Sequence, residues 1–406
     1  MKPQSEIKTL FIVKEIPYPP IGGVCLRNWQ NINIMTKFGA VAVFAIDHKA
    51  SDVKELPNIN AFNYHQLGNS TSISSVNISS VSSHQNDPTN NLSCKYVDDN
   101  CDRQGIEILK SIMVDFQPDL VIIEQLWLFR YLEILKFYPC KIILDEHNIE
   151  ADLLKQREGI NISESELAIV EGIEKEAIAQ SDQVWVCSNS DRQLLREKYG
   201  NFNHIHLVPN GIDVDSYNFI NNFNKKKSSQ NKIIYSGYFP YEPNQIAAKL
   251  LIQEIFPKLQ QQYSDASLML VGYSPSEFML EAARENNNIV VTGTVADVKP
   301  YFYDASAMVV PLLQGGGTRL KILEAFASGC PVISTTKGAE GLQAQNGEHL
   351  LLRDSISDII EGVVSVWSDI NLSQRLTQSA YNLVKITYSW QAVVQNIEDA
   401  IKQLFL

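Results

Sequence analysis

The feature that most constrains the fold is a series of short, almost continuously apolar runs separated by longer segments with helical spacing. The runs lie at residues 10–13, 41–46, 120–123, 141–144, 183–187, 232–235, 267–271, 289–292, 308–311, 331–334 and 349–352. Strands buried on both faces of a parallel sheet are apolar throughout, whereas strands with one solvated face alternate. The pattern therefore predicts an α/β protein with doubly wound parallel sheets.

The length and the interruption of the pattern predict two such sheets. The chain has 406 residues, and residues 211–232 include the polar stretch "NNFNKKKSSQNK", which is typical of a linker. We expect an N-terminal Rossmann-like domain at 1–212 and a C-terminal one at 213–385, facing each other across a cleft. A last helix, 386–406, is expected to return to the N-terminal domain. The Ser- and Asn-rich segment 69–104 is either a surface loop or a lid that recognises an acceptor.

Composition excludes several classes of protein. Acidic residues outnumber basic ones, 46 to 34, which gives a net charge of −12 and argues against a nucleic-acid binder. No apolar run approaches the roughly 18 residues of a membrane span, although a peripheral membrane contact stays open. The six cysteines form no CxxC pair and are expected to be reduced, with Cys187 and Cys330 in the core. Without a pattern typical of a signal peptide, the protein is expected to be cytoplasmic.

The stretch "LLQGGGTRLKILEAFASGCPVIST" at 312–335 predicts an anion site. Three glycines stand where a strand gives way to a helix, and the free amides of a helix N-terminus attract anions that glycine allows to approach. Thr318 is expected to cap the helix or to bind a phosphate oxygen, and Arg319 and Lys321 add positive charge. Glu324 is suited to accept hydrogen bonds from a pair of sugar hydroxyls. The alternative is an ordinary helix start with solvated charges.

This stretch and the following "KGAEGL" (337–342) closely resemble the family 4 glycosyltransferases of the GT-B fold, in the branch with the sequence GGGTRLKxLEA. Further motifs occur in the order of that family: "PYPPIGG" (17–23), "DEHNIE" (145–150), "VCSNSDRQLL" (186–195), "VPNGID" (208–213) and "VTGTVADVKPYFYDASAMVVP" (291–311). The resemblance covers nearly the whole chain apart from about residues 50–110.

The resemblance implies an enzyme that transfers a sugar, expected to be a hexose, from a nucleotide-sugar donor with retention of anomeric configuration. It implies no metal and no cofactor; the co-substrate is a nucleotide sugar, with UDP- or GDP-linked sugars favoured. The acceptor is a saccharide, lipid, peptide or small molecule. Donor-binding residues by position in the motifs are Gly22, Gly23, Val295, Gly316, Gly317, Thr318 and Glu324. His147, Arg319 and Lys321 match catalytic positions, with His147 contacting the transferred sugar and the two cations neutralising the leaving diphosphate.

Two departures from the family pattern affect the site. The first glutamate of the E-x7-E motif of many relatives is replaced by Gly316, eight residues before Glu324. The Arg and Lys that many relatives carry after the first strand of the C-terminal domain are absent from "SGYFPYEPN", which offers Tyr238 and Asn244 instead. Neutralisation of the diphosphate is therefore expected to depend on Arg319, Lys321 and backbone amides, with Arg27 as a further candidate.

The sequence leaves alternatives for the roles of two residues and for the activity of the protein. Arg27 and Glu124 are expected near the cleft and are candidates for binding the acceptor, or else for a structural ion pair. The missing first glutamate also allows a non-catalytic nucleotide-sugar binding partner or pseudoenzyme. A GT-B sugar-nucleotide epimerase is the remaining alternative, and detection of transfer to an acceptor would separate it from a transferase.

Overall fold

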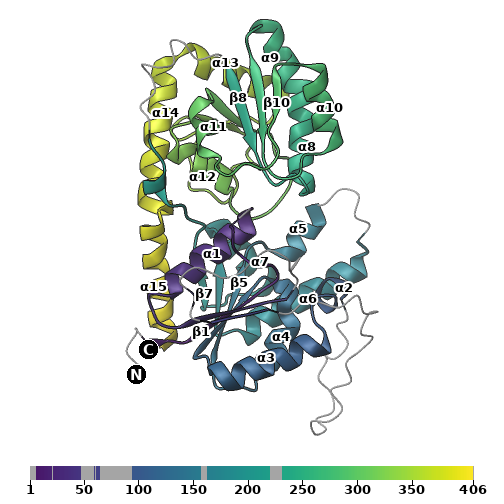
Figure 1. The fold of residues 1–406 in the computed structure, drawn as a ribbon, viewed down its shortest axis with the longest axis vertical. Coiled ribbons are helices and arrows are strands. Elements are labelled where there is room, and N and C mark those ends of the chain that lie inside the picture. Colours follow the sequence, from purple (N-terminus) through teal and green to yellow (C-terminus); the bar gives the residue numbers. More distant parts are fainter. Residues whose placement is uncertain are drawn as a thin grey trace. The chain divides into compact units, whose positions relative to one another are not determined.

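The computed structural model describes residues 6–20, 22–46, 59, 61–64, 94–156, 162–219 and 231–405. The chain divides into two compact units (Figure 1), of which unit 1 comprises Met1–Val208 and Asn396–Leu406 and unit 2 comprises Pro209–Gln395. None of the helices in these described ranges is long and apolar enough to span a membrane. Most of the polar segment 69–104, and residues 220–230 of the expected linker, lie outside the described residues.

Unit 1 is built on a seven-stranded sheet with the order β3-β2-β1-β4-β5-β6-β7, and every neighbouring pair is parallel. Its strands are β1 Thr9–Val13, β2 Val41–Ala45, β3 Ala61–Tyr64, β4 Leu120–Glu124, β5 Lys141–Glu146, β6 Gln183–Val186 and β7 Ile205–Leu207. In β1, β2, β4 and β6 every residue is buried, which explains why these strands are apolar throughout.

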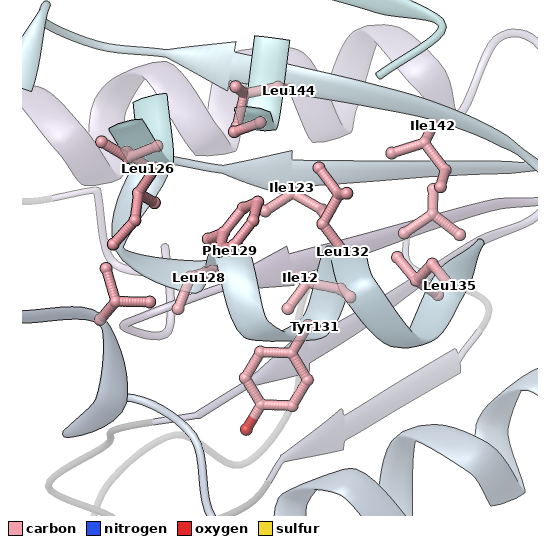
Figure 2. Packing of buried hydrophobic residues seen from close by; sticks show 14 of the residues in the cluster. Ile12, Ile123, Leu126, Leu128, Phe129, Tyr131, Leu132, Leu135, Ile142 and Leu144 are labelled. Atoms are coloured by element: carbon pink, nitrogen blue, oxygen red, sulfur yellow. The ribbon is translucent and has the colours of Figure 1, made fainter. Parts of the chain in front are cut away.

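The helices of unit 1 fill the connections between its strands. They are α1 Gly23–Met35, α2 Lys95–Asp98, α3 Arg103–Phe116, α4 Phe129–Leu135, α5 Glu150–Gln156, α6 Glu164–Gln180 and α7 Asn189–Tyr199, with a short 3-10 helix at Leu126–Leu128. In Figure 2, Phe129 and Leu132 of α4 pack beside Ile12, Ile123 and Leu144 of the sheet, within one buried hydrophobic cluster. Burial of such side chains stabilises the fold by about 1.5–3 kcal/mol each.

Unit 2 contains a six-stranded parallel sheet with the order β10-β9-β8-β11-β12-β13. Its strands are β8 Lys232–Ser236, β9 Ser267–Val271, β10 Ile289–Val291, β11 Ala307–Val310, β12 Val332–Ser334 and β13 Leu351–Leu352. The helices are α8 Glu242–Leu250, α9 Phe256–Gln262, α10 Glu277–Glu285, α11 Lys299–Asp304, α12 Leu320–Ala327, α13 Ile356–Ser368 and α14 Ile370–Leu383. A 3-10 helix at Val214–Ser216 and π-helical turns at Leu251–Ile255 and Val384–Tyr388 complete it.

The last helix, α15 Trp390–Phe405, contributes residues to both units. Its C-terminal part, from Asn396, groups with unit 1, where the Gln183 side chain donates a hydrogen bond of 2.7 Å to the Ala400 carbonyl oxygen. The predicted doubly wound α/β architecture is thus confirmed. The cysteines among the described residues form no disulfide bond with one another, and Cys187 and Cys330 are buried as predicted.

Strand order fixes where each unit can bind a ligand. In unit 1 the chain runs outward from β1 to β3 and then returns to β4 beside β1; in unit 2 it runs from β8 to β10 and returns to β11 beside β8. Loops leave such adjacent strands in opposite directions and open a crevice at their carboxyl ends. The segments that follow β1 and β4, and those that follow β8 and β11, are therefore where functional side chains are expected.

Candidate active site

The glycine-rich loop of unit 2 connects β11 to α12 at its switch point. Gly315 has φ of 116° and Gly317 has φ of 66°, both in the region that residues with a side chain rarely adopt. A Cβ atom on Gly315 would lie 3.0 Å from Arg319 Nη2 and 3.1 Å from the Tyr241 hydroxyl oxygen. The loop conformation and its close packing therefore both require glycine.

Helix α12 begins later than the sequence predicts. Its first residue is Leu320, and Arg319 occupies the N-cap position without a side-chain cap. Thr318 precedes the helix and does not cap it, so that of its two expected roles the helix cap is wrong and the contact to a phosphate oxygen stays a prediction. Instead, the Thr318 hydroxyl accepts a hydrogen bond of 2.7 Å from the Asn210 side chain, which holds the loop against the segment that follows β7.

Lys321 points from α12 toward the end of β8. Its Nζ atom donates a hydrogen bond of 2.8 Å to Asn244 Oδ1 and lies 4.0 Å from the centre of the Tyr235 ring. No carboxylate in the described part of the chain pairs with this ammonium group. Burial, reinforced by the charge of Arg319, lowers the pKa of Lys321 well below its usual value. An amino group buried among neutral partners at a switch point is suited to bind an anion, whose negative charge would favour the protonated form of the lysine.

Asn244 holds the Lys321 ammonium group in place. Its Oδ1 atom also accepts a hydrogen bond of 2.7 Å from the Tyr235 hydroxyl, and its Nδ2 atom donates one of 2.7 Å to the Tyr238 carbonyl oxygen. Gly237 lies beside this group, since a Cβ atom there would lie 3.2 Å from Lys321 Nζ. Lys321 thus brings positive charge to the loop after β8, where the sequence itself offers only Tyr238 and Asn244.

Arg319 differs from Lys321 in its partners, which are backbone carbonyl groups of the glycine-rich loop. Its Nη1 atom donates hydrogen bonds to the carbonyl oxygens of Gly316 and, at 3.4 Å, of Gly317. Only 8% of its surface is exposed. The guanidinium group therefore ties the glycine-rich loop to the start of α12 while keeping its charge at that loop.

Glu324 lies in α12, partly buried, beside a hydroxyl-bearing ring. The Tyr217 hydroxyl donates a hydrogen bond of 3.2 Å to Glu324 Oε1. Burial raises the pKa of Glu324 to about 7, although Tyr217 and Lys321 oppose the shift. Val295 lies in the loop between β10 and α11, also partly buried. A carboxylate with one hydroxyl donor already in contact is suited to accept the hydroxyls of a sugar.

In unit 1, Arg27 of α1 is buried in an ion pair. Its Nε atom donates to Asp145 Oδ2 at 3.0 Å, its Nη2 atom donates to Asp145 Oδ1, and its Nη1 atom donates to the Val208 carbonyl oxygen at 2.8 Å. Asn31 Nδ2 donates a further hydrogen bond of 2.8 Å to Asp145. Only 1% of the Arg27 surface is exposed. This geometry favours the structural ion pair over direct recognition of a ligand by Arg27.

Glu124 and His147 meet at the carboxyl ends of neighbouring strands. Glu124 is the last residue of β4, and His147 follows β5; His147 Nε2 lies 2.8 Å from Glu124 Oε2. Exposed fractions are 1% for Glu124 and 6% for His147. Burial raises the pKa of Glu124 to about 7 and lowers that of His147 to about 4, so the imidazole is neutral at pH 7.

Gly22 and Gly23 lie where β1 leads into α1. Gly22 is the N-cap residue of α1, with φ of 86°, and no side chain caps the helix there. The amides of the first turn of α1 are thus left without a side-chain acceptor from the N-cap. By strand order, this start of α1 and the ends of β4 and β5 lie at the same edge of the sheet of unit 1.

Among the described residues, three buried side chains of unit 1 bring together donor atoms of the kind that bind metals. Ligand atoms of Glu124, Asp145 and His147 all lie within 4.8 Å of one another. Asp145, however, already accepts hydrogen bonds from Arg27 and Asn31, so a guanidinium group supplies the positive charge that this carboxylate needs. The arrangement fits a buried ion pair with a neutral histidine better than a metal centre.

Several partners of the site residues were not predicted from the sequence. Asp145, Asn31, Asn210 and Tyr217 each contact a predicted site residue, or its ion-pair partner, from a distant part of the chain. Two of them lay within quoted motifs, "DEHNIE" and "VPNGID", and the alternation of side chains past a strand end places Asp145 on the same side as His147. Asn31 and Tyr217 carry no sequence pattern that identifies them.

The chain matches two families of known sequences. Residues 100–216 match the family described as "Glycosyltransferase Family 4", and residues 230–369 match "Glycosyl transferases group 1". A curated relative, a lipopolysaccharide 1,2-N-acetylglucosaminetransferase from Salmonella typhimurium (strain LT2), is 27% identical over 222 residues, which are 50% of this chain and 57% of that protein. The curated relatives are thus matched over about half of their length.

Solved structures share the fold over nearly the whole chain. Sucrose-phosphate synthase from Thermosynechococcus elongatus has a TM-score of 0.74 and 15% identity, with 98% of this chain and 99% of that chain covered. HepE from Anabaena, in complex with UDP, has a TM-score of 0.70 and 13% identity, with 98% and 100% covered. The two sequence matches and this shared fold show that the chain belongs to the family 4 glycosyltransferases, with the GT-B fold.

Proposed function

We propose that the chain transfers a sugar from a UDP-linked donor to an acceptor hydroxyl with retention of anomeric configuration. The observation that carries this proposal is the environment of Lys321, a buried lysine with neutral partners beside a glycine-rich loop and the start of a helix. The diphosphate of a nucleotide sugar supplies the anion that this environment lacks. Glu324 then accepts the ribose hydroxyls, and Val295 lies beside the base.

The choice of UDP over GDP is supported by a structural neighbour. Structures of HepE from Anabaena contain UDP and UDP-glucose, and that protein shares the fold with this chain. In the proposed reaction the acceptor oxygen bonds to the anomeric carbon as the bond from that carbon to the diphosphate oxygen breaks on the same face. The leaving phosphate oxygen takes the acceptor's proton, and UDP is released.

Charge neutralisation of the leaving group is the main catalytic contribution in this proposal. Negative charge builds on the diphosphate in the transition state, where Lys321, Arg319 and the loop amides are already in place. His147, in unit 1, is proposed to contact the transferred sugar. No metal ion is required, because the cations of the chain provide the neutralising charge.

The test is turnover of UDP-glucose and related donors by the wild type and by the double variant Arg319→Met and Lys321→Met. We expect kcat to fall at least about a hundredfold, with donor affinity falling less, because the lost charge matters most in the transition state. The matched control is Lys258→Met with Arg284→Met, two exposed cations of unit 2 whose removal is expected to leave kcat unchanged. Circular dichroism checks folding of both.

The products separate this proposal from the alternatives. NMR of the product must show the anomeric configuration of the donor for a retaining transferase, and inversion would refute retention. Formation of an isomeric nucleotide sugar without transfer would indicate an epimerase. Binding of UDP-glucose without hydrolysis or transfer, across a panel of acceptors, would indicate a non-catalytic partner. A kcat of the double variant within about threefold of wild type would refute the role of the two cations.

A further inference from the structure

The contact between Glu124 and His147 is fixed by the backbone. In the parallel pairing of β4 with β5, Glu124 lies opposite Asp145, and His147 follows two residues later. The histidine and Asp145 therefore emerge on the same side of the strand, toward the end of β4. The resulting distance from His147 Nε2 to Glu124 Oε2 is 2.8 Å, and both side chains are buried.

The neighbours of the histidine ring select one tautomer. Gln125 Nε2 lies 3.4 Å from His147 Nδ1, and since an amide nitrogen can only donate, Nδ1 is the acceptor in this contact. The proton of the neutral ring is then on Nε2, where Glu124 Oε2 accepts it. The two contacts are consistent with each other, since one nitrogen of a neutral imidazole donates and the other accepts.

The amide of Asn28 lies beside the same pair. Its Nδ2 atom lies 2.9 Å from Glu124 Oε2, 3.1 Å from the Val24 carbonyl oxygen and 3.2 Å from His147 Nε2. With the ring proton on Nε2, the two amide hydrogens go to Glu124 and Val24; a proton on Nδ1 would instead leave Nε2 as a third acceptor, so the contacts of Gln125 and Glu124 assign the tautomer. Glu124 Oε2 then accepts from two N–H groups, and these hydrogen bonds favour the ionised carboxylate against the burial that raises its pKa to about 7. Asp145 is engaged by Arg27 and Asn31, and its closest carboxylate oxygen lies 3.8 Å from His147 Nε2, so Glu124 is the direct partner of the ring.

We propose that Glu124 is a positioning residue that holds His147 as its Nε2–H tautomer and thereby presents Nδ1 as a hydrogen-bond acceptor for a hydroxyl of the transferred sugar. The inference rests on the proposed function. In it, Glu124 acts on the donor sugar indirectly, by positioning His147, and does not bind the acceptor. The burial of Glu124 agrees with this assignment, because a carboxylate that binds an acceptor directly needs an exposed oxygen. The long Gln125 contact at Nδ1 is the one that a sugar hydroxyl would replace.

The first experiment measures the tautomer directly. In protein labelled with ¹⁵N-histidine, the His147 resonances, assigned by their loss in His147→Ala, are expected to show the Nε2–H form at pH 7. Glu124→Met removes the acceptor at similar side-chain length, and we expect the Nδ1–H form to gain population. Glu124→Gln keeps an acceptor oxygen and is expected to retain the Nε2–H form. Unchanged His147 resonances in Glu124→Met would overturn the proposal.

The matched control is Glu146→Met. Glu146 is also a buried carboxylate of β5, but it lies on the other face of the strand from Asp145 and His147 by alternation. We expect it to leave the ratio of His147 tautomers unchanged. A change equal to that in Glu124→Met would show a general effect of removing a buried carboxylate, and would likewise overturn the proposal.

The second experiment uses turnover. Glu124→Met is expected to lower kcat about tenfold or more with the KM for the acceptor within about threefold, and Glu124→Gln is expected to recover most of kcat. In a His147→Ala background, the Glu124→Met change should cost less than about twofold more, because the two residues act as one unit. An undiminished effect in that background, or a raised KM for the acceptor, would show that Glu124 acts on the acceptor instead. If no donor is turned over, the proposed function fails, while the tautomer measurement still decides the role of Glu124.

Discussion

At the scale of single residues, Glu324 combines partial burial with a raised pKa of about 7. If its ionised form accepts the ribose hydroxyls, the affinity for UDP-glucose, which does not itself titrate near pH 7, should rise as the pH increases through 7. Glu324→Gln should weaken binding by about 1–3 kcal/mol at pH 8 and remove most of this pH dependence, because a charged acceptor is lost. Calorimetry from pH 6 to pH 8 measures both effects.

The same substitution has an opposite effect on stability. Because the folded-state pKa of Glu324 lies above its unfolded value, ionisation of this group opposes folding as the pH rises through that range. Glu324→Gln should therefore be at least as stable as wild type at pH 8, in spite of its weaker binding. Glu281→Gln, at an exposed position on α10, is the control and should change neither property. Equal UDP-glucose affinity in wild type and Glu324→Gln would contradict the ribose assignment.

A second prediction at this scale concerns the donor atoms of Glu124, Asp145 and His147. Since Arg27 already neutralises Asp145, and Lys321 and Arg319 are proposed to neutralise the diphosphate, turnover of UDP-glucose should continue in the presence of EDTA. The measurement compares initial rates with EDTA, with added magnesium and with added manganese. Loss of turnover in EDTA that either metal restores would require a different account of the leaving group.

At the scale of elements, the glycine-rich loop combines backbone strain with function. An alanine at position 317, where φ is 66°, should cost roughly 1–2 kcal/mol in stability, because a left-handed conformation crowds the Cβ atom. Gly347→Ala is the matched control, since Gly347 has φ of 78° and open space around its Cα. We expect similar losses of stability in thermal unfolding, but a loss of UDP-glucose affinity only in Gly317→Ala. Equal affinities in the two variants would show that the loop does not bind the donor.

Elements were more predictable from the sequence than the contacts between them. Continuous apolar runs identified the central strands, because burial on both faces leaves a pattern in the sequence itself. Strands β3 and β7 were not predicted; β7 is three residues long, with His206 at its centre. One of the two roles expected for Thr318, that of capping α12, was wrong, because the helix begins at Leu320 and the Thr318 hydroxyl accepts a hydrogen bond from Asn210. The segment 69–104 was expected to be a loop throughout, but α2 lies within it and α3 begins before its end.

The site was predictable as a set of residues, and less so as a set of contacts. Motif positions identified Lys321, Glu324 and His147, but the partners that define their chemistry come from far along the chain. Lys321 meets Asn244 across 77 positions, and Arg27 meets Asp145 across 118. Only the strand order brings such segments together. That is why a sequence pattern could leave Arg27 open between ligand contact and ion pair, whereas the structure favours the ion pair.

At the scale of the whole molecule, the two units have separate sheets and separate candidate sites. The proposed diphosphate and ribose contacts all lie in unit 2, whereas Glu124 and His147 lie in unit 1. UDP, which lacks the sugar, should therefore be recognised mainly by unit 2. The intact sugar nucleotide should add a contact that depends on His147.

Hydrogen exchange on the full chain tests this division. With UDP, we expect slower amide exchange in peptides covering the glycine-rich loop and the start of α12, and in the loop between β10 and α11 that contains Val295. At a UDP concentration a hundred times the dissociation constant, binding should stabilise the folded protein by about 2.7 kcal/mol, which makes the protection measurable. UDP-glucose should add protection at the end of β5, and His147→Ala should remove this addition while leaving the protection by UDP intact. Protection by UDP that appears only in peptides of α1, β4 and β5 would place the nucleotide in unit 1 and would refute the assignment of the donor site to unit 2.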